Sequence, residues 1–444
     1  MATNLGVAPL AGLREIVGEE HARAAMAGDA VDGVRPRFVV APGSVEEVAA
    51  VMRLAHSAGL AVAPRGAGTK LGWGNRPREL DLIVSTRRLD GPPEHAVGDL
   101  VVRAGAGVTL ETLQGTVGQA GQRLALDPPE KGATLGGIVA ANPSGPLRLR
   151  YGTARDLLIG ATVVLADGMV AKAGGKVVKN VAGYDLCKLF AGSLGTLGIV
   201  VETIWRLHPV PAARRTVVVE VATSDELGLA AQDLLHGSSP LVLDALDVRW
   251  DPQPFSRARE REAGGAGSLA VLFEGIEPGV VAQAETAERL LARFGASRIT
   301  TTEEQDALWR AARAYPWHGQ GEGYDVGLKI THPLAALPDI LGSIVELARA
   351  HGMVARITGH AATGVTFVAL SGRNVGSVPT LLEELRERVA RAEGSVVALC
   401  APPDIKERID VWGPVGDALP LMRRVKERFD PDGILNPGRF VGGI

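Results

Sequence analysis

Cysteine, aromatic side chains, net charge and long apolar runs are all scarce in this 444-residue chain. Its two cysteines, Cys187 and Cys400, form no metal-spaced pair, which favours a reduced compartment and leaves no ligand run for an iron–sulfur cluster. A net charge of −3 with 4% aromatic residues predicts no nucleic-acid partner. No apolar run approaches the ~20 residues that span a bilayer, and the first residues lack the order of a signal peptide. We therefore expect a cytoplasmic chain, peripheral at the inner membrane at most through partners.

Apolar residues make up 46% of the chain, which is long enough for two domains by the rough guide of ~150 residues each. Near the start, residues 13–26 read as a helix. Ser44 and Glu47 form a capping box before an apolar stripe of helical spacing, and Gly59 ends that stripe. Short apolar runs on both sides of it predict a strand–helix–strand unit.

Further along, residues 159–173 predict a β-hairpin around the two-residue turn Asp167-Gly168. A proline pair at 209 and 211 marks the domain boundary, and strands alternate with helices beyond it. Within that region, the alternating Arg and Glu of residues 251–267 favour a solvated loop over a binding patch. An amphipathic helix over Leu419–Phe429 then runs into a turn-rich tail.

The stretch Pro64–Gly74 is the most informative part of the sequence. Its four glycines let successive N–H groups point into one concavity, and such a nest suits a phosphate. Arg65 and Lys70 add full charges at the rim. The spacing excludes two familiar phosphate loops, because a dinucleotide fingerprint needs glycine where Leu71 stands and a P-loop needs Gly-Lys-Ser/Thr. An ordinary glycine-rich surface loop remains the alternative.

Three more glycine-rich clusters follow, at Leu126–Gly145, Gly174–Tyr184 and Gly192–Gly198. Glycine permits close approach of a ligand to the backbone, although each cluster alone is a weak signal. Together the four clusters predict a long cofactor that touches the backbone at several points. A nucleotide the size of flavin adenine dinucleotide (FAD) fits this extent better than a mononucleotide does.

Five motifs, taken in order, resemble the FAD-binding domain of the vanillyl-alcohol oxidase and p-cresol methylhydroxylase (PCMH) family. They are Pro64–Thr69, Gly132–Gly137, Tyr151-Gly152 with Asp156, Gly183–Leu186 and Gly195–Val200. The tail Phe429–Gly438 is similar to the C-terminal end of that family. Within the family, Ser144–Arg148 and Lys179–Asp185 look most like the FAD-binding subunits of bacterial glycolate oxidases.

The resemblance implies an α+β fold in four parts. An N-terminal helix lies within residues 1–30, and a two-subdomain FAD-binding domain of the PCMH type follows over residues 31–211. Residues 212–420 form an α+β cap whose antiparallel sheet is flanked by helices. A C-terminal segment, residues 421–444, returns to the flavin.

The resemblance also implies which residues bind the cofactor. We call the stretch Pro64–Gly74 the opening loop. Its residues 65–69 would hold the FAD diphosphate through backbone N–H groups. Residues 128–142 would line the flavin and ribityl region, and residues 199 and 200 would lie on the adenine side. The full set implied is Arg65, Gly66, Ala67, Gly68, Thr69, Lys70, Pro128, Thr134, Gly136, Gly137, Asn142, Ser144, Arg148, Ile199, Val200 and Asn436.

Three departures from the family pattern matter. Covalent members carry histidine in or near the opening loop, which has none here, so we expect non-covalent FAD. Ala141 replaces a small polar residue that often precedes the family's Asn. Related 2-hydroxy-acid dehydrogenases bind a metal through both histidines of a GHxxxGxxH motif, but here His360 is followed by Phe367 at the second position. One imidazole cannot build a metal site that activates a hydroxy acid, so we predict no metal.

The catalytic residues are left open by the sequence. His360 reads as a buried, hydrogen-bonded remnant or as a general base, and Arg148 and Tyr151 are further weak candidates. Arg148 could bind a carboxylate in bidentate fashion, contact the flavin phosphate, or have a role at the protein surface. His318 and its aromatic neighbours could face the flavin or simply pack.

Three functions compete. The first is the FAD-binding subunit of a glycolate oxidase-type complex, which acts on a small 2-hydroxy acid with a catalytic FAD subunit and an iron–sulfur subunit. The second is a self-sufficient FAD-dependent glycolate or D-lactate dehydrogenase. The third is a non-catalytic scaffold subunit.

Overall fold

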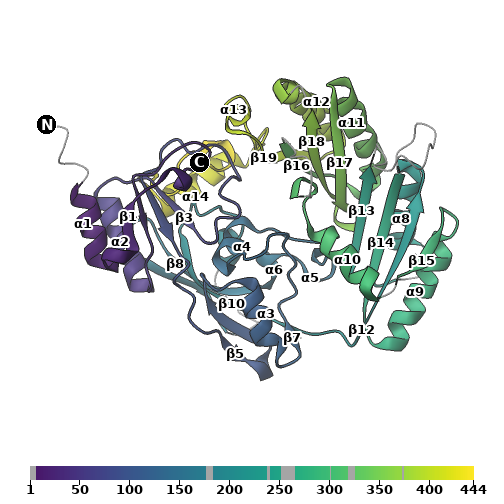
Figure 1. Ribbon diagram of the computed structural model, residues 1–444, viewed down its shortest axis with the longest axis horizontal. Coiled ribbons are helices and arrows are strands. Elements are labelled where there is room, and N and C mark those ends of the chain that lie inside the picture. The colour runs from purple at the N-terminus through teal and green to yellow at the C-terminus, as the bar shows by residue number, and fades with distance from the viewer. Residues whose placement is uncertain are drawn as a thin grey trace.

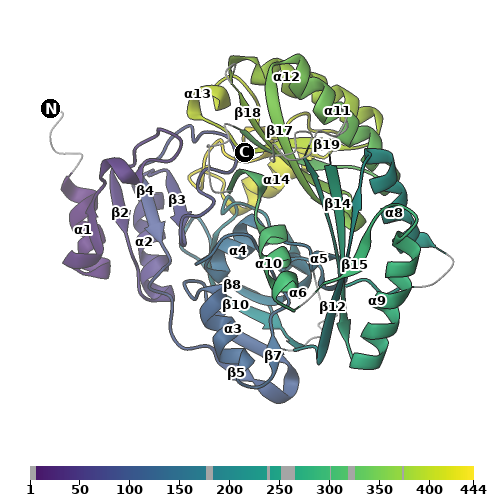
Figure 2. The ribbon, with the colours of Figure 1, turned by 45° about the vertical axis from the view of Figure 1, so that its right-hand side comes forward.

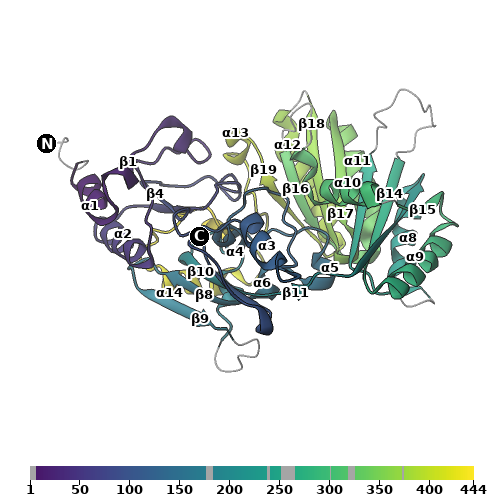
Figure 3. The ribbon, with the colours of Figure 1, turned by 60° about the horizontal axis from the view of Figure 1, so that its bottom comes forward.

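The computed structural model describes residues 7–176, 184–237, 241–251, 266–300, 302–318, 326–372 and 375–444. Three bodies lie in a row in Figure 1: an N-terminal subdomain (purple), a second subdomain (blue) and a cap (teal to green). The last part of the chain (yellow) turns back toward the first two bodies. Figure 3 shows the same row from below, with the cap sheet at the right.

The N-terminal subdomain is a small sheet covered by two helices. Its strand order is β1 (Ala22–Ala24), β2 (Phe38–Val40), β4 (Leu82–Ser85) and β3 (Val62–Arg65), with only the β1–β2 pair antiparallel. The helices are α1 (Val7–Val17) and α2 (Val45–Ser57). At the start of α2, the Ser44 hydroxyl accepts the N–H of Glu47, as the capping box predicts. The strand–helix–strand unit β2–α2–β3 therefore forms as expected.

The predicted helix over residues 13–26 is wrong in its extent. The helix α1 ends at Val17, where Gly18 adopts a φ of 93° that side-chain-bearing residues avoid. Residues 22–24 then pair with β2 and become an edge strand. Pairing with a distant strand is invisible to a local reading of periodicity.

The second subdomain is built on a five-stranded antiparallel sheet. The strand order is β5 (Glu94–Ala96), β6 (Val101–Gly105), β10 (Ile199–Arg206), β8 (Leu158–Val164) and β9 (Val170–Gly174). The predicted hairpin is the β8–β9 pair. Short helices surround this sheet, namely α3 (Leu110–Gly118), α4 (Leu135–Ala141), α5 (Arg148–Tyr151), α6 (Ala154–Leu157) and α7 (Cys187–Phe190), and β7 (Gln122–Arg123) pairs with β11 (His208–Pro209).

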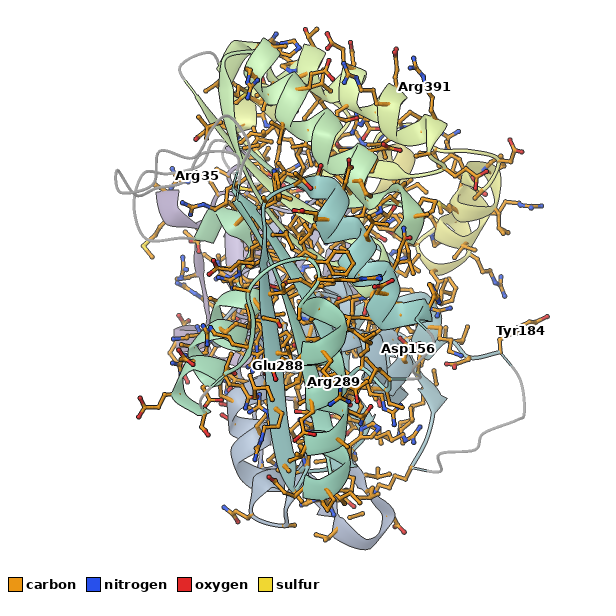
Figure 4. The ribbon with its side chains drawn as sticks, turned by 90° about the vertical axis from the view of Figure 1, so that its right-hand side faces the viewer. Arg35, Asp156, Tyr184, Glu288, Arg289 and Arg391 are labelled. Atoms are coloured by element: carbon orange, nitrogen blue, oxygen red, sulfur yellow. The ribbon has the colours of Figure 1, made fainter. Side chains whose placement is uncertain are left out.

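The cap is one eight-stranded antiparallel sheet. Its order is β15 (Ser297–Ile299), β12 (Ala213–Val221), β14 (Ala266–Gly275), β13 (Ala245–Asp251), β17 (Met353–His360), β18 (Val365–Gly372), β16 (Val326–Thr331) and β19 (Ser395–Cys400). Four helices cover its outer face in Figure 2: α8 (Ser224–His236), α9 (Glu277–Leu291), α11 (Leu337–Ala350) and α12 (Val378–Arg391). Figure 4 looks onto this helical face, with Glu288 and Arg289 on α9.

The inner face of the cap sheet turns toward the second subdomain. Along β14, Leu269, Val271 and Phe273 pack under the helices, whereas Ala270 and Leu272 pack on the inner side against α10 (Thr302–Arg313). Leu147 of the second subdomain joins this inner cluster. Both faces of the central strands are therefore buried, and the cap is packed directly against the domain before it.

Two sequence predictions fall on residues that the structure leaves undescribed. Residues 177–183 contain most of the Lys179–Asp185 motif, and residues 252–265 contain most of the predicted solvated loop; both lie outside the described residues. The side chain of His318 is also outside them. The predicted helix Leu419–Phe429 is α14, and a short helix, α13 (Pro403–Lys406), precedes it beside the N-terminal subdomain.

Candidate functional site

The loop after β3 presents a row of unengaged N–H groups. From Gly66 to Lys70, no backbone N–H donates a hydrogen bond to any part of the chain that the structure describes. Gly68 adopts a φ of 83°, which bends the loop and favours glycine. Such a run of N–H groups is the nest that the sequence predicts, and its polarity suits an anion.

The loop lies against the first turn of α4. Thr134 is the N-cap of that helix, and a Cβ on Gly66 would lie 2.1 Å from its hydroxyl oxygen. A Cβ on Gly136 would lie 2.8 Å from the Cβ of Ala106. Glycine at both positions therefore lets the opening loop, α4 and the residue that follows β6 approach one another, which explains why the first two glycine-rich clusters meet.

The C-terminal segment completes this site. Leu435 forms a parallel bridge with Val62 at the start of β3, and the N–H of Asn436 donates to the carbonyl of Val62 at 2.8 Å. The Asn436 amide nitrogen donates to the carbonyl of Leu194 at 2.6 Å. Its amide oxygen is buried without a hydrogen-bond partner. Residue 436 therefore returns to the opening loop, as the family resemblance implies. Its side-chain oxygen is left able to accept a hydrogen bond.

These elements surround a cavity of about 750 Å³, counting the space open to solvent. Most of the implied cofactor residues line it: Arg65, Gly66, Ala67, Gly68, Thr69, Lys70, Thr134, Gly136, Gly137, Ile199, Val200 and Asn436. Leu194 and Arg439 also line it, although the sequence by itself assigns them no binding role.

The two charges expected at the rim are already paired within the protein. Arg65 donates to Asp29 at 3.1 Å, and the pKa of Asp29 lies well below its ordinary value because Arg23 and then Arg65 hydrogen-bond to it. Lys70 forms a buried ion pair with Glu130, and burial lowers the pKa of its ammonium. The sequence separations of 36 and 60 residues hide both partners from sequence reasoning.

Pro128, Asn142, Ser144 and Arg148 are not among the residues that line this cavity. The Ser144 hydroxyl accepts from Arg148 at 3.2 Å, and the Asn142 side chain accepts the N–H of Arg155 at 3.3 Å. Beside them, buried Asp127 accepts the N–H groups of Gly145 and Leu147. Burial raises the pKa of Asp127 to about 6, although nearby Arg313 opposes this change. Ser144 and Arg148 therefore contact each other, Asn142 contacts the start of α6, and the cofactor role of all four residues stays a prediction.

His360 lies on the inner face of the cap at the end of β17. It is 4% exposed, and its Nδ1 lies 3.8 Å from the Asp247 Oδ1, with neither atom hydrogen-bonded. The alternative of a hydrogen-bonded remnant is therefore wrong for Nδ1. Phe367 packs edge-on against the imidazole at the position where the related dehydrogenases have a second histidine. Within the described residues, no three His, Cys, Asp or Glu side chains are placed to hold a metal ion.

The aromatic side chains beside His360 pack together in one cluster. Tyr315 stacks on Trp317 at 4.6 Å between ring centroids and contacts Phe367 and Trp73. We call the residues that line the cavity the cradle. Trp73 belongs to the opening loop, so this cluster joins the cap to the cradle. Of the two alternatives that the sequence leaves open, packing describes Tyr315 and Trp317.

Tyr151 lies at a different point of the boundary between the two domains. Arg123 of β7 donates to the Tyr151 hydroxyl at 2.8 Å and to Glu274 of β14 at 3.1 Å. Tyr151 and Glu274 are thereby held together across the boundary, and burial is the main cause that raises the pKa of the Tyr151 phenol. These contacts give Tyr151 a structural role in docking the cap, and a catalytic role for it stays untested.

The residues of the cradle fit FAD. The unengaged N–H groups suit a diphosphate, two glycines allow the backbone to approach closely, and a buried amide oxygen awaits a donor. No histidine lines the cavity, in agreement with non-covalent binding. When the described residues are searched, no helix is found that is both long and apolar enough to cross a bilayer.

Two family models match the chain. One, described as an FAD binding domain, matches residues 36–174, and the other, described as the C-terminal domain of FAD linked oxidases, matches residues 210–398 and 413–440. Together they cover most of the two subdomains and of the cap. FAD is therefore the cofactor of this chain.

Relatives and solved structures agree with this match. The chain is 28% identical to a D-lactate dehydrogenase of Archaeoglobus fulgidus, with 91% of each chain covered. It is 27% identical to the glycolate oxidase subunit GlcD of Bacillus subtilis, over 91% of this chain and 89% of that protein. Its fold is similar to that of p-cresol methylhydroxylase with bound substrate, with a TM-score of 0.77 at 17% identity over 99% and 97% of the two chains.

Proposed function

We propose that this chain, a member of the PCMH-type family of FAD-dependent oxidoreductases, is the FAD-carrying subunit of a glycolate oxidase-type complex. Such a complex oxidises a small 2-hydroxy acid and passes electrons through a catalytic FAD subunit and an iron–sulfur subunit. We expect it in the cytoplasm, at the inner membrane only through partners. When bound, FAD provides the chemistry of a two-electron acceptor for this oxidation.

One contrast carries the proposal. The cradle around residues 66–70 is intact, whereas the cap offers the single imidazole of His360 where metal-assisted oxidation needs several convergent ligands. A chain that keeps FAD, and whose described residues gather no such set of ligands, is suited to electron transfer beside a subunit that has them.

Two cations support an anionic substrate at the inner face of the cap. Lys329 of β16 lies opposite Phe367 of β18, and burial lowers the pKa of its ammonium to about 8, with Arg148 as the second cause. Within the described residues, neither Lys329 nor Arg148 forms an ion pair. In our proposal Arg148 binds the carboxylate of the 2-hydroxy acid, while the aromatic cluster around Tyr315 excludes water.

The test begins with the FAD-loaded chain alone. Anaerobic glycolate or D-lactate should leave the flavin absorbance unchanged, while dithionite bleaches it and a dye restores it. In the source organism, deletion of the gene should abolish glycolate-dependent dye reduction, and the wild-type gene should restore it. Dehydrogenase-like turnover by the isolated chain contradicts the proposal. A colourless protein that cannot take up FAD would indicate the scaffold function instead.

A self-sufficient 2-hydroxy-acid dehydrogenase is the second candidate, favoured by the buried pair of His360 and Asp247. In this alternative Asp247 orients the imidazole, which takes the hydroxyl proton as a general base. Substrate should then bleach the flavin of the isolated chain, and His360→Gln should abolish the bleaching. Bleaching that survives in the His360→Gln variant would exclude this role.

A further inference from the structure

The far half of the opening loop, residues 71–74, is held by two buried cations. The Arg439 guanidinium donates to the carbonyls of Leu71 and Trp73, and the Lys406 ammonium donates to those of Gly72 and Gly74. Four successive carbonyls are thus accounted for. The near half of the loop, residues 66–70, keeps its N–H groups free of internal partners among the described residues.

Lys406 reaches the loop from a segment that the family models do not cover. Residues 399–412 fall between the two stretches matched to the C-terminal domain, and α13 within them places Lys406 2.9 Å from Asp32. The same segment contacts Asn75, whose side chain accepts the N–H of Val411 at 3.0 Å. Trp412, at its end, donates to the carbonyl of Arg439 at 3.0 Å. We call residues 399–412 the strap.

Arg439 carries a positive charge that the protein does not neutralise. It lines the cavity, is 4% exposed, and its Nε is buried without a hydrogen-bond partner. No carboxylate forms an ion pair with it among the described residues. Arg65 and Lys70, by contrast, are paired with Asp29 and Glu130.

A buried charge without a counter-ion is costly even when it donates to carbonyls, and Arg439 bears that cost. Burial lowers its pKa to about 10, and Asp32 opposes this change only through space. An anion in the cavity would remove the cost. FAD brings such an anion in its diphosphate, and the free N–H groups of residues 66–70 lie along the same cavity.

We propose that Arg439 is an FAD-binding residue that supplies the buried counter-charge of the diphosphate, and that Lys406 of the strap is a positioning residue that holds the loop for it. This inference rests on the FAD cradle and is independent of the substrate and of partner subunits. It also accounts for retention of a cofactor that no covalent bond holds.

The experiment compares two ligands on the full-length chain stripped of FAD. FAD carries the diphosphate, whereas riboflavin has the same ring without it, and both are titrated by flavin fluorescence. Arg439→Met should weaken FAD at least about tenfold and leave riboflavin within about threefold, while Arg439→Lys should recover part of the loss. Equal weakening of both ligands, or unchanged FAD affinity, overturns the role of Arg439.

Lys406→Met tests the strap. It should weaken FAD by about tenfold or more and speed the release of FAD on dilution. Glu407→Gln is the matched control, because the exposed pair of Glu407 with Arg76 joins the same two segments, and it should leave FAD affinity within about twofold. Equal effects of the two variants would contradict a positioning role for Lys406.

A measurement on the unmutated chain keeps the inference testable if a variant does not fold. Inorganic pyrophosphate should compete with FAD for the stripped protein, and sulfate at matched ionic strength should not. Failure of pyrophosphate to compete would contradict an anion subsite at Arg439.

Discussion

Glycine at position 66 leaves the space that the hydroxyl of Thr134 occupies. Gly66→Ala would place a methyl group 2.1 Å from that oxygen, and relief requires either the loop to move away from α4 or the Thr134 side chain to leave its N-cap position. We expect FAD affinity to fall at least about tenfold while the stripped protein still folds. Equilibrium titration with FAD measures the first, and circular dichroism the second.

Gly115→Ala is the matched control for this substitution. Gly115 lies on α3, and a Cβ there meets no atom within 4 Å. Alanine should keep FAD affinity unchanged and stabilise the helix by up to about 1 kcal/mol. Similar FAD affinities of the two variants would exclude the close approach at Gly66 as a requirement for binding.

Asp127 predicts a pH dependence of stability. Burial raises its pKa from 3.8 to about 6, so between these values the folded protein holds a proton that the unfolded chain releases. Its contribution to stability is present at low pH and is lost as the pH rises toward about 6, by roughly 1.4 kcal/mol for each pH unit between the two pKa values. Calorimetry should show that the stability of Asp127→Asn relative to wild type is higher at about pH 7 than at about pH 5. An equal difference at both pH values would contradict this assignment.

Sequence reasoning identified most residues of the cradle but not its charges. Glycine-rich stretches are visible in the sequence, and the family resemblance implies a cofactor role for residues 66–69 and for Thr134, Gly136 and Gly137, all of which line the cavity. The role of charges depends on partners that are distant in sequence. Arg65 and Lys70 look free in the sequence, yet both are paired, and no local pattern distinguishes Arg439 from an ordinary surface arginine.

At the scale of secondary-structure elements, α14 is fixed by a buried ion pair. Lys426 donates to Asp430 at 2.5 Å and to the carbonyls of Thr196 and Leu435 at 2.9 and 2.8 Å. Lys426→Met leaves the fully buried Asp430 carboxylate without its cation, and should lower the free energy of unfolding by about 3–5 kcal/mol. Chemical denaturation measures this change.

Two comparisons make the test of Lys426 specific. Lys188→Met breaks an exposed pair with Asp185 and should cost no more than about 1 kcal/mol. The double variant Lys426→Met with Asp430→Asn should lose less stability than Lys426→Met alone. A larger loss in the double variant would show that the buried charge is not the cause.

Elements with strong local signals were predicted well, and those made by pairing were not. The capping residue Ser44, the β8–β9 hairpin and the bounds of α14 all appear as the sequence predicts. Residues 22–24 were read as helix, because their strand character comes from pairing with β2. The order of the eight cap strands has the same origin, since β13 pairs with β17 about a hundred residues later and no repeat in the sequence indicates this.

At the scale of the whole molecule, one buried ion pair links the cap to the second subdomain. Arg123 contacts Glu274, whose side chain is 2% exposed, and Tyr151. Arg214 also pairs with Glu274, at 3.4 Å, so Arg123→Met leaves the buried carboxylate with one of its two cations. We therefore expect a loss of about 1.5–3 kcal/mol, together with earlier release of the cap during unfolding. Calorimetry should then show two unfolding transitions that lie further apart in temperature than those of the wild type.

Arg388→Met serves as the control for the Arg123 variant. Arg388 pairs with exposed Glu346 across the outer helices of the cap at 2.8 Å, so its loss should cost no more than about 1 kcal/mol. If both variants unfold alike, the boundary between cap and second subdomain is not held by Glu274.

The bridge between Leu435 and Val62 determines when, during synthesis, the cofactor can be gripped. Arg439 and Leu71 lie 368 residues apart in the chain, so a ribosome that has finished the opening loop must still make the whole cap before the last wall of the cavity exists. Stable loading with FAD is therefore a late event in biogenesis. Nascent chains stalled within the cap should therefore be colourless. They should bind FAD only after residues 436–439 have left the ribosomal exit tunnel.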